Sequence, residues 1–244
     1  VRTVLMQTAA RPPAPALLHA AGLWLRGCLL TLAALGLLLV AVVLGIAIGE
    51  TEISVRTVFE VLANQLAGAS YAVDPINQGI VWNYRLTRAL VAACCGAGLA
   101  ISGVILQSLL RNALAEPYLL GISAGASTGA VLVTVAGLGA GAISMTTGAF
   151  VGAVCAFALV ALLAHAAGRG GLHNSGQIVL AGIAGSQLFN ALTSLIITKS
   201  GSAEQARGIM FWLLGSLSGV RWPDTLGAAT VAVAGTVVCL LHAR

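Results

Sequence analysis

The chain has 244 residues, of which 59% are hydrophobic and only 8% are charged. A soluble domain carries about a quarter charged residues, so this composition excludes a water-soluble globular protein. The formal net charge of +5 comes from scattered residues, without a basic run or a basic helix face, and this excludes a nucleic-acid-binding surface. The 30 glycines favour a bundle of closely packed membrane helices over a single membrane anchor.

Six stretches of the chain are apolar enough to be membrane spans, each of which needs about 20 apolar residues. The first, residues 27–49, is longer than the apolar core of a signal peptide, so we expect a retained span that follows a cytoplasmic segment over residues 1–26. The other spans are expected over residues 89–110, 119–137, 145–165, 178–198 and 226–241. The sequence therefore predicts an all-α, polytopic transmembrane helical bundle over residues 27–244.

The segments between the spans also carry patterns. Four apolar residues after the first span recur at helical spacing and predict a short amphipathic helix, at the membrane surface or outside the membrane: Val55, Val58, Phe59 and Leu62. The stretch from Pro117 to Arg169 is too long for one crossing, and its glycine-rich run 137–141 is the expected turn. Residues 209–220 are apolar but too few to cross, which predicts a re-entrant or interfacial helix.

Six spans place both termini on the same side of the membrane, and the side with more Lys and Arg should be cytoplasmic. The 12 basic residues divide equally between the two sides under this topology. The prediction of a cytoplasmic N-terminus therefore depends only on the shorter loops of that side.

Catalytic and metal-binding patterns are not found within the predicted spans. All five cysteines lie in apolar stretches, without a histidine at metal-ligand spacing: Cys28, Cys94, Cys95, Cys155 and Cys239. The spans contain no carboxylate pair or Ser-His-Asp set, and the chain has no Walker motif. We therefore expect no catalytic residue, no metal site and no cofactor, and we do not expect an enzyme.

Three stretches carry a family resemblance. The first contains WNYRLTR (82–88) and GAGLAISG (96–103), the second RNALAEP (111–117) and LLGISAGA (119–126), and the third VLAGIA (179–184) and FWLLGSL (211–217). In their order and spacing they resemble the permease family of bacterial ABC importers for ferric siderophores, haem and cobalamin, the FecCD/BtuC-like permeases. The resemblance covers about residues 27–244.

This resemblance implies a type II importer permease in the bacterial cell (inner) membrane. The partners it implies are a separate ABC ATPase subunit, an extracytoplasmic substrate-binding protein and a second permease subunit, as a homodimer or a related chain. The implied substrate is an iron-siderophore, haem or a corrinoid such as cobalamin. A secondary transporter is a weaker alternative, because we predict no charged residue at mid-membrane that could couple protons or sodium.

The resemblance also implies roles for individual residues. Arg85 and Arg88 are expected to face outward and pair with acidic residues of the binding protein, although arginines that anchor to lipid phosphates would fit the same pattern. Asn174 and Ser175 fall at the family's cytoplasmic gate, where an ordinary flexible turn is the alternative.

The glycines between residues 121 and 129 could be taken for a phosphate cradle. No P-loop lysine follows them, and they begin a predicted span. We therefore expect Gly121, Gly125 and Gly129 to serve close helix packing.

The chain departs from the family pattern at several places. Thr87 and Ala113 stand where the family usually has proline, which predicts less rigid backbone there. The family usually has about ten spans, so with about six the chain is expected to be incomplete at its C-terminus, as a fragment or truncated product. The alternative function is a degenerate half-permease or membrane scaffold that does not transport and assembles with a partner.

Overall fold

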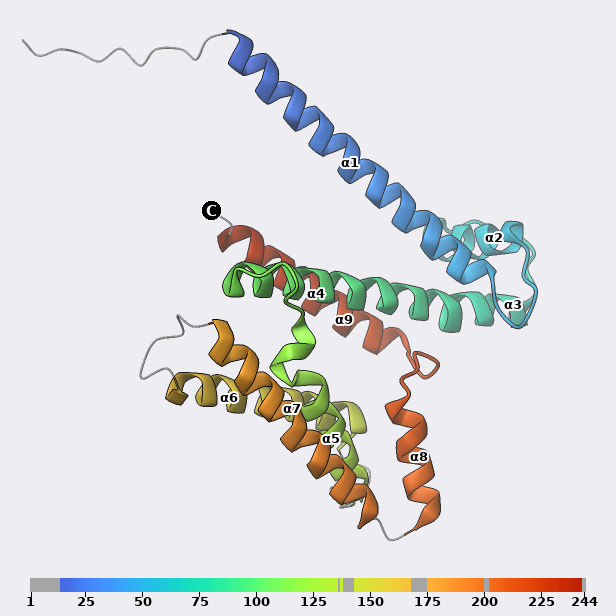
Figure 1. The fold of residues 1–244 in the computed structure, drawn as a ribbon. Coiled ribbons are helices and arrows are strands. Elements are labelled where there is room, and N and C mark those ends of the chain that lie inside the picture. Colours follow the sequence, from blue (N-terminus) through green and yellow to red (C-terminus); the bar gives the residue numbers. More distant parts are fainter. Residues whose placement is uncertain (1–13, 136, 138–142, 168–174, 200–201, 243–244) are drawn as a thin grey trace, which may run out of the picture. The chain divides into compact units, whose positions relative to one another are not determined.

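The computed structural model describes residues 14–135, 137, 143–167, 175–199 and 202–242, and every regular element in these ranges is a helix (Figure 1). This confirms the predicted all-α fold. The chain divides into two compact units, Val1–Ala93 and Cys94–Arg244, whose boundary falls within helix α4.

The first unit contains the helices that precede this boundary. They are α1 (Ala14–Ala47), α2 (Val55–Ala67), α3 (Pro75–Gly79), the π-helical turn η1 (Ile80–Arg85) and the start of α4 (Leu86–Leu110). The last three follow one another directly, so that one apolar helical stretch of 36 residues runs over Pro75–Leu110. The predicted second span, residues 89–110, is the C-terminal part of this stretch.

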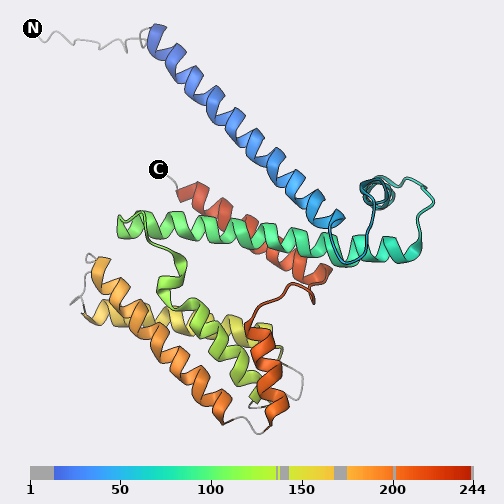
Figure 2. The same cartoon turned by 45° about the vertical axis from the view of Figure 1, so that its right-hand side comes forward.

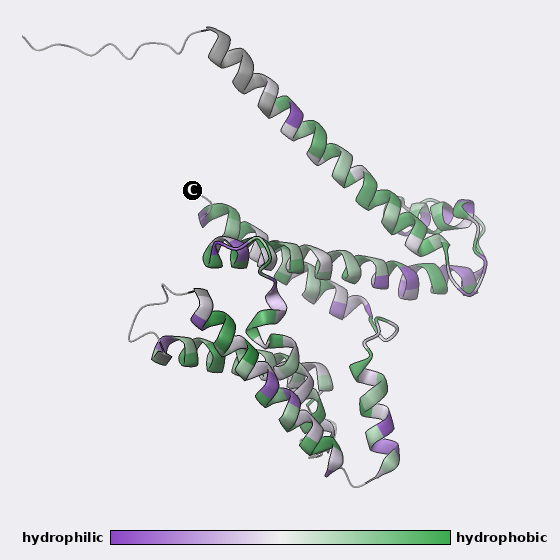
Figure 3. Cartoon of the chain, viewed as in Figure 1, coloured by the Kyte–Doolittle hydropathy of each residue, from purple (hydrophilic) through white to green (hydrophobic). Residues whose placement is uncertain are grey.

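Helix α1 is longer than the predicted first span. It begins at Ala14, so residues 14–26 are helical and continuous with the span. The predicted span begins at Gly27, directly after the charged Arg26, but an arginine is tolerated in a helix that continues beyond the hydrocarbon region. The part of α1 long and apolar enough to cross a membrane is Leu25–Ala47, and Figure 3 shows hydrophobic residues along this part.

Helix α2 confirms the predicted amphipathic helix. The hydroxyl of Ser54 caps its start by accepting a hydrogen bond from the Thr57 N–H at 3.1 Å, and Gly68 ends it in the left-handed conformation with φ 66°. Val58 and Val61 are buried where α2 meets α1 and η1, whereas Phe59 is 63% exposed. Of the four residues of the predicted pattern, Val58 is thus buried and Leu62 is half-buried, whereas Val55 and Phe59 are exposed.

The second unit contains the remainder of α4 and the helices after it. They are the 3-10 helix η2 (Pro117–Leu120), α5 (Ile122–Val135), α6 (Met145–Ala167), α7 (Ser175–Thr198), α8 (Ala203–Leu213) and α9 (Trp222–His242). Helices α5, α6 and α7 pack against one another, and the views in Figures 1 and 2 agree on this. A cluster of buried apolar residues joins the end of α4 to α6 and α7: Leu106, Leu110, Ala115, Val160, Ala164, Ile178 and Ala181.

Five described helices are long and apolar enough to cross a membrane, and they correspond to five of the six predicted spans. The uninterrupted third span over 119–137 is not present. Gly121 adopts a left-handed φ of 70°, which separates η2 from α5, and α5 has 14 residues, or about 21 Å of helix. The predicted short helix over 209–220 is also displaced, because α8 ends at Leu213 and Gly215 follows it with a φ of 81°.

Candidate functional site

The backbones of α5 and α6 touch each other at four glycines, Gly125 and Gly129 on α5 and Gly148 and Gly152 on α6. A Cβ atom added to Gly125 would lie only 2.5 Å from the Gly152 carbonyl oxygen, and one added to Gly129 would lie 2.9 Å from the Gly148 carbonyl carbon. Each pair is separated by four residues, so both members of a pair lie on the same helix face. The sequence pattern predicted packing at the two glycines of α5. Gly148 and Gly152 were not predicted, although they have the same spacing in the sequence.

A second close approach joins η2 to α7. A Cβ atom added to Gly121 would lie 3.2 Å from Ser186 Oγ, and one added to Gly182 would lie 2.9 Å from the Leu119 carbonyl carbon. Gly121 therefore needs to be glycine for its left-handed backbone, and Gly182 needs to be glycine for space. Gly182 belongs to the VLAGIA motif, but its contact with η2 is not visible in the sequence.

Two buried threonines connect α5 to α7. Thr128 and Thr193 are 5% and 7% exposed, and their hydroxyl oxygens are 2.7 Å apart. Thr128 Oγ1 also lies 2.9 Å from the Phe189 carbonyl oxygen on α7. Hydrogen bonds between membrane helices contribute about 0.6 kcal/mol each on average, so this pair adds modestly to the glycine contacts.

Arg85, the last residue of η1, is buried with only 9% of its surface exposed. Its guanidinium donates to backbone carbonyls at and just after the end of α1: Nη1 bonds the oxygens of Ile46 and Ala47 at 2.9 Å each, and Nη2 bonds the oxygen of Thr51. Gly49 lies directly against the guanidinium, since an added Cβ atom there would be 2.7 Å from Nη2. This burial disagrees with the predicted docking role of Arg85, because its donors already face the chain's own backbone.

Arg88 lies in the first turn of α4, three residues after Arg85, and its side chain is exposed. Thr87, directly before Arg88, is fully buried, and its hydroxyl lies 3.0 Å from the carbonyl oxygens of Asn83 and Tyr84. The predicted docking residue that remains accessible is therefore Arg88.

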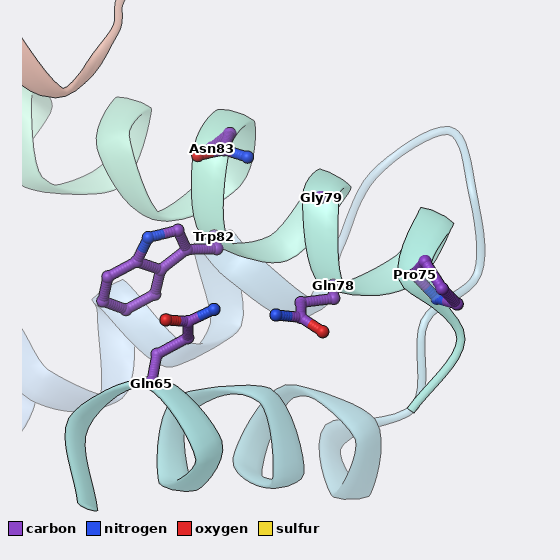
Figure 4. A pocket seen from close by; sticks show the side chains of 6 residues that line it. All are labelled: Gln65, Pro75, Gln78, Gly79, Trp82 and Asn83. Atoms are coloured by element: carbon purple, nitrogen blue, oxygen red, sulfur yellow. The ribbon is translucent and has the colours of Figure 1, made fainter. Parts of the chain in front are cut away.

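A shallow polar hollow lies between α2 and the start of the long helix, in the same unit as the two arginines. Figure 4 shows the amide of Gln65 on α2 pointing toward Trp82 of η1, with Gln78 of α3 beside it. Its other lining residues are Pro75, Gly79 and Asn83. The lining carries amides and an indole but no charged side chain.

The predicted gate residues lie at the edge of the described structure. Asn174 falls outside the described residues, and Ser175 is the first residue of α7. Their role as a cytoplasmic gate stays a prediction.

The profile of the FecCD transport family matches residues 37–244, which is most of the chain. The chain belongs to the FecCD transport family. Its spans and its family membership make it a multi-pass protein of the cell (inner) membrane.

Individual relatives of this family are similar over most of the chain. The cobalamin import system permease protein BtuC of Halobacterium salinarum is 35% identical over 87% of this chain and 65% of its own length. The hemin transport system permease protein HmuU of Yersinia pestis is 33% identical over 85% of this chain and 59% of its own length. The Fe(3+) dicitrate transport system permease protein FecC of Escherichia coli is 38% identical over 68% of this chain and 49% of its own length.

A solved structure described as a metal-chelate type ABC transporter in an inward-facing conformation has a similar fold. It superposes with a TM-score of 0.64 at 29% identity and covers 84% of this chain and 58% of its own. The chain thus spans about half to two thirds of the length of the FecCD-family proteins it matches.

The glycine contacts of this FecCD-family chain give a first prediction. Gly125→Ala should destabilise the protein by about 1 to 3 kcal/mol, because the atoms it would strike on α6, the Ala156 Cβ and the backbone of Gly152, are rigidly held and cannot move aside. The melting temperature in detergent should fall by about 2 to 12 °C. It is measured by circular dichroism or with a fluorescent dye that does not react with cysteine thiols.

Gly235→Ala on α9 is the matched control, since a Cβ atom there meets nothing within 4 Å. It should leave the melting temperature unchanged or raise it slightly, as alanine favours a helix over glycine by about 0.5 to 1 kcal/mol. Equal melting temperatures for the two variants would contradict the packing role of Gly125.

Proposed function

We propose that the chain forms a membrane-spanning permease subunit of an ABC importer that moves a ferric siderophore, haem or cobalamin across the cytoplasmic membrane. The observation that carries this proposal is the match of the FecCD transport family over residues 37–244. The names of the relatives support a bulky chelate as the cargo, since they include permeases for cobalamin, hemin and Fe(3+) dicitrate. Another relative is named as the molybdate import system permease protein MolB of Haemophilus influenzae, so the named cargoes of the relatives also include an oxyanion.

The proposed pathway runs between helices and not through a charged pore. The apolar stretch Leu25–Ala47 and the helices α6 and α7 contain no Asp, Glu, Lys or Arg except Arg26 near the start of the first. A small ion would usually need charged or polar groups at mid-membrane to replace its water, whereas a chelate already encloses its metal.

The energy and the substrate specificity of this importer would come from other chains. The chain has no Walker motif, so ATP hydrolysis belongs to a separate ATPase subunit. A soluble binding protein would deliver the chelate from outside, and a second permease subunit, identical or related, would complete the pathway. A transporter with these subunits would work by alternating access, in which ATP binding to the ATPase subunit changes the side of the membrane to which the pathway opens.

Transport is tested in cells that carry the complete set of importer genes, with this chain present or deleted. Radiolabelled ferric siderophore, haem and cobalamin are supplied separately. We expect accumulation of one of the three only when the chain is present and the ATPase subunit is active. Accumulation of none of them, while the chain is inserted in the membrane at normal levels, would favour a scaffold that does not transport.

Docking of the soluble binding protein is proposed to depend on Arg88. Arg88→Glu should weaken docking at least tens of times, because breaking a close interfacial charge pair costs about 2 to 5 kcal/mol. The dissociation constant is measured with the assembled transporter in nanodiscs. Reversal of the matching acidic residue on the binding protein should restore part of the affinity, and unchanged docking in Arg88→Glu would leave lipid anchoring as the role of this arginine.

The segment around Asn174 and Ser175 is proposed to lie at the cytoplasmic side near the axis between two permease subunits. Cysteines placed at Ser175 of both subunits, in a background without the five native cysteines, should form a disulfide across the axis. The yield of cross-linked dimer on a gel should change with the nucleotide bound to the ATPase, because a gate opens and closes. A position that never cross-links in any nucleotide state, while control cysteine pairs do, would contradict the gate.

A further inference from the structure

The two arginines of the WNYRLTR motif carry the same charge but lie in different surroundings. Arg85 is buried to 9% exposure and directs its donors to carbonyls 34 to 39 residues earlier in the chain, whereas Arg88 is exposed. A residue whose donors are already committed within the chain needs a different explanation.

The carbonyls that Arg85 contacts are the ones most in need of a donor. The last four carbonyls of a helix have no intrahelical partner, and Ile46 and Ala47 are the last two residues of α1. Thr51 belongs to the bend that follows the helix. A guanidinium offers five N–H donors in a rigid fork, so that one side chain serves the helix end and the bend together. Its positive charge also complements the partial negative charge at a helix C-terminus.

The guanidinium of Arg85 packs directly against the backbone of Gly49, in the space that a side chain at this position would occupy. A Cβ atom added to Gly49 would lie 2.7 Å from Nη2 and 2.8 Å from Cζ of Arg85. Real Cβ atoms do not approach heavy atoms so closely, and the guanidinium would have to leave its carbonyls to make room. Gly45, one turn earlier on α1, is different, since its added Cβ atom would meet Ala89 at an ordinary distance of 4.0 Å.

We propose that Arg85 is a positioning residue that fixes the C-terminal end of α1 to the helix running from Pro75 to Leu110, with Gly49 as the seat of its guanidinium. The arginine acts within the permease and does not form part of the surface that meets a soluble binding protein. This proposal refines the proposed docking surface, but its structural part does not depend on transport.

The first test uses the full chain in nanodiscs, without a binding protein. Arg85→Gln and Arg85→Lys should both lower the melting temperature, by about 4 to 10 °C for the glutamine, because a single ammonium or amide cannot serve all three carbonyls. Amide hydrogen exchange over residues 46–53 should become at least tenfold faster, while exchange in α5 and α6 stays unchanged. Unchanged exchange at residues 46–53 in both variants would overturn the proposal.

The second test asks whether Arg85 and Gly49 act as a pair. Gly49→Ala should lower the melting temperature in the wild-type background but have almost no further effect in the Arg85→Gln background, since both substitutions remove the same bonds. Gly45→Ala is the control, and its effect should be the same in both backgrounds. Additive effects of Gly49→Ala and Arg85→Gln would overturn the assignment of Gly49 as the seat.

The third test separates this proposal from the proposed docking function. In the assembled transporter, well below the melting temperature, Arg85→Gln should change the dissociation constant of the binding protein less than threefold. A loss of affinity as large as that of Arg88→Gln would show that Arg85 acts at the interface and would overturn the proposal. If Arg88→Gln leaves docking unchanged while the exchange and pairing results appear as expected, the docking function fails and the role of Arg85 stands.

Discussion

Every backbone polar group that a chain places in lipid must find its hydrogen-bond partner within the protein, because the hydrocarbon core has no water to supply one. Helix interiors meet this requirement themselves, but the ends of helices do not. In the first unit, the guanidinium of Arg85 supplies donors to the end of α1. In the second unit, hydroxyls of Thr128 and of other serines and threonines return to carbonyls of their own helix or of a neighbour. The all-α architecture and the location of these few polar side chains thus follow from one constraint.

The hydrophobic effect, which packs helices in soluble proteins, is absent between helices in lipid, because a leucine side chain gains nothing by moving from lipid to a protein interior. Close contact between backbones remains available, and this explains where glycine is required. Gly125 and Gly129 meet Gly148 and Gly152 so closely that a methyl group on any of them would strike backbone atoms. Many other glycines, such as Gly227 and Gly235 on α9, have open space around them. Glycine content alone therefore indicates a packed bundle, whereas the contacts identify the residues on which the packing depends.

The lengths of the apolar blocks were enough to predict the fold class and three helices closely. The predicted spans 145–165, 178–198 and 226–241 correspond to α6 (Met145–Ala167), α7 (Ser175–Thr198) and α9 (Trp222–His242). The predicted span 119–137 failed because the left-handed backbone of Gly121 is a local conformation that composition does not reveal. The partners of Arg85 could not be predicted either, since they come from residues more than 30 positions away and depend on how α1 packs against η1.

The different surroundings of Arg85 and Arg88 originate in the backbone between them and the turn before them. The N–H of Leu86 bonds the carbonyl of Val81, five residues earlier, so η1 contains one residue more per turn than an α-helix. One extra residue rotates the helix before it by about 100° relative to the helix after it. A regular helix pattern would not bury Arg85, Leu86 and Thr87 in succession, yet all three are less than 10% exposed. The π turn thus directs Arg85 to the end of α1 while Arg88, on the regular helix after the turn, faces outward. Of the two arginines in this short motif, the fold thus buries the one that reaches the backbone acceptors at the end of α1 and leaves the other exposed.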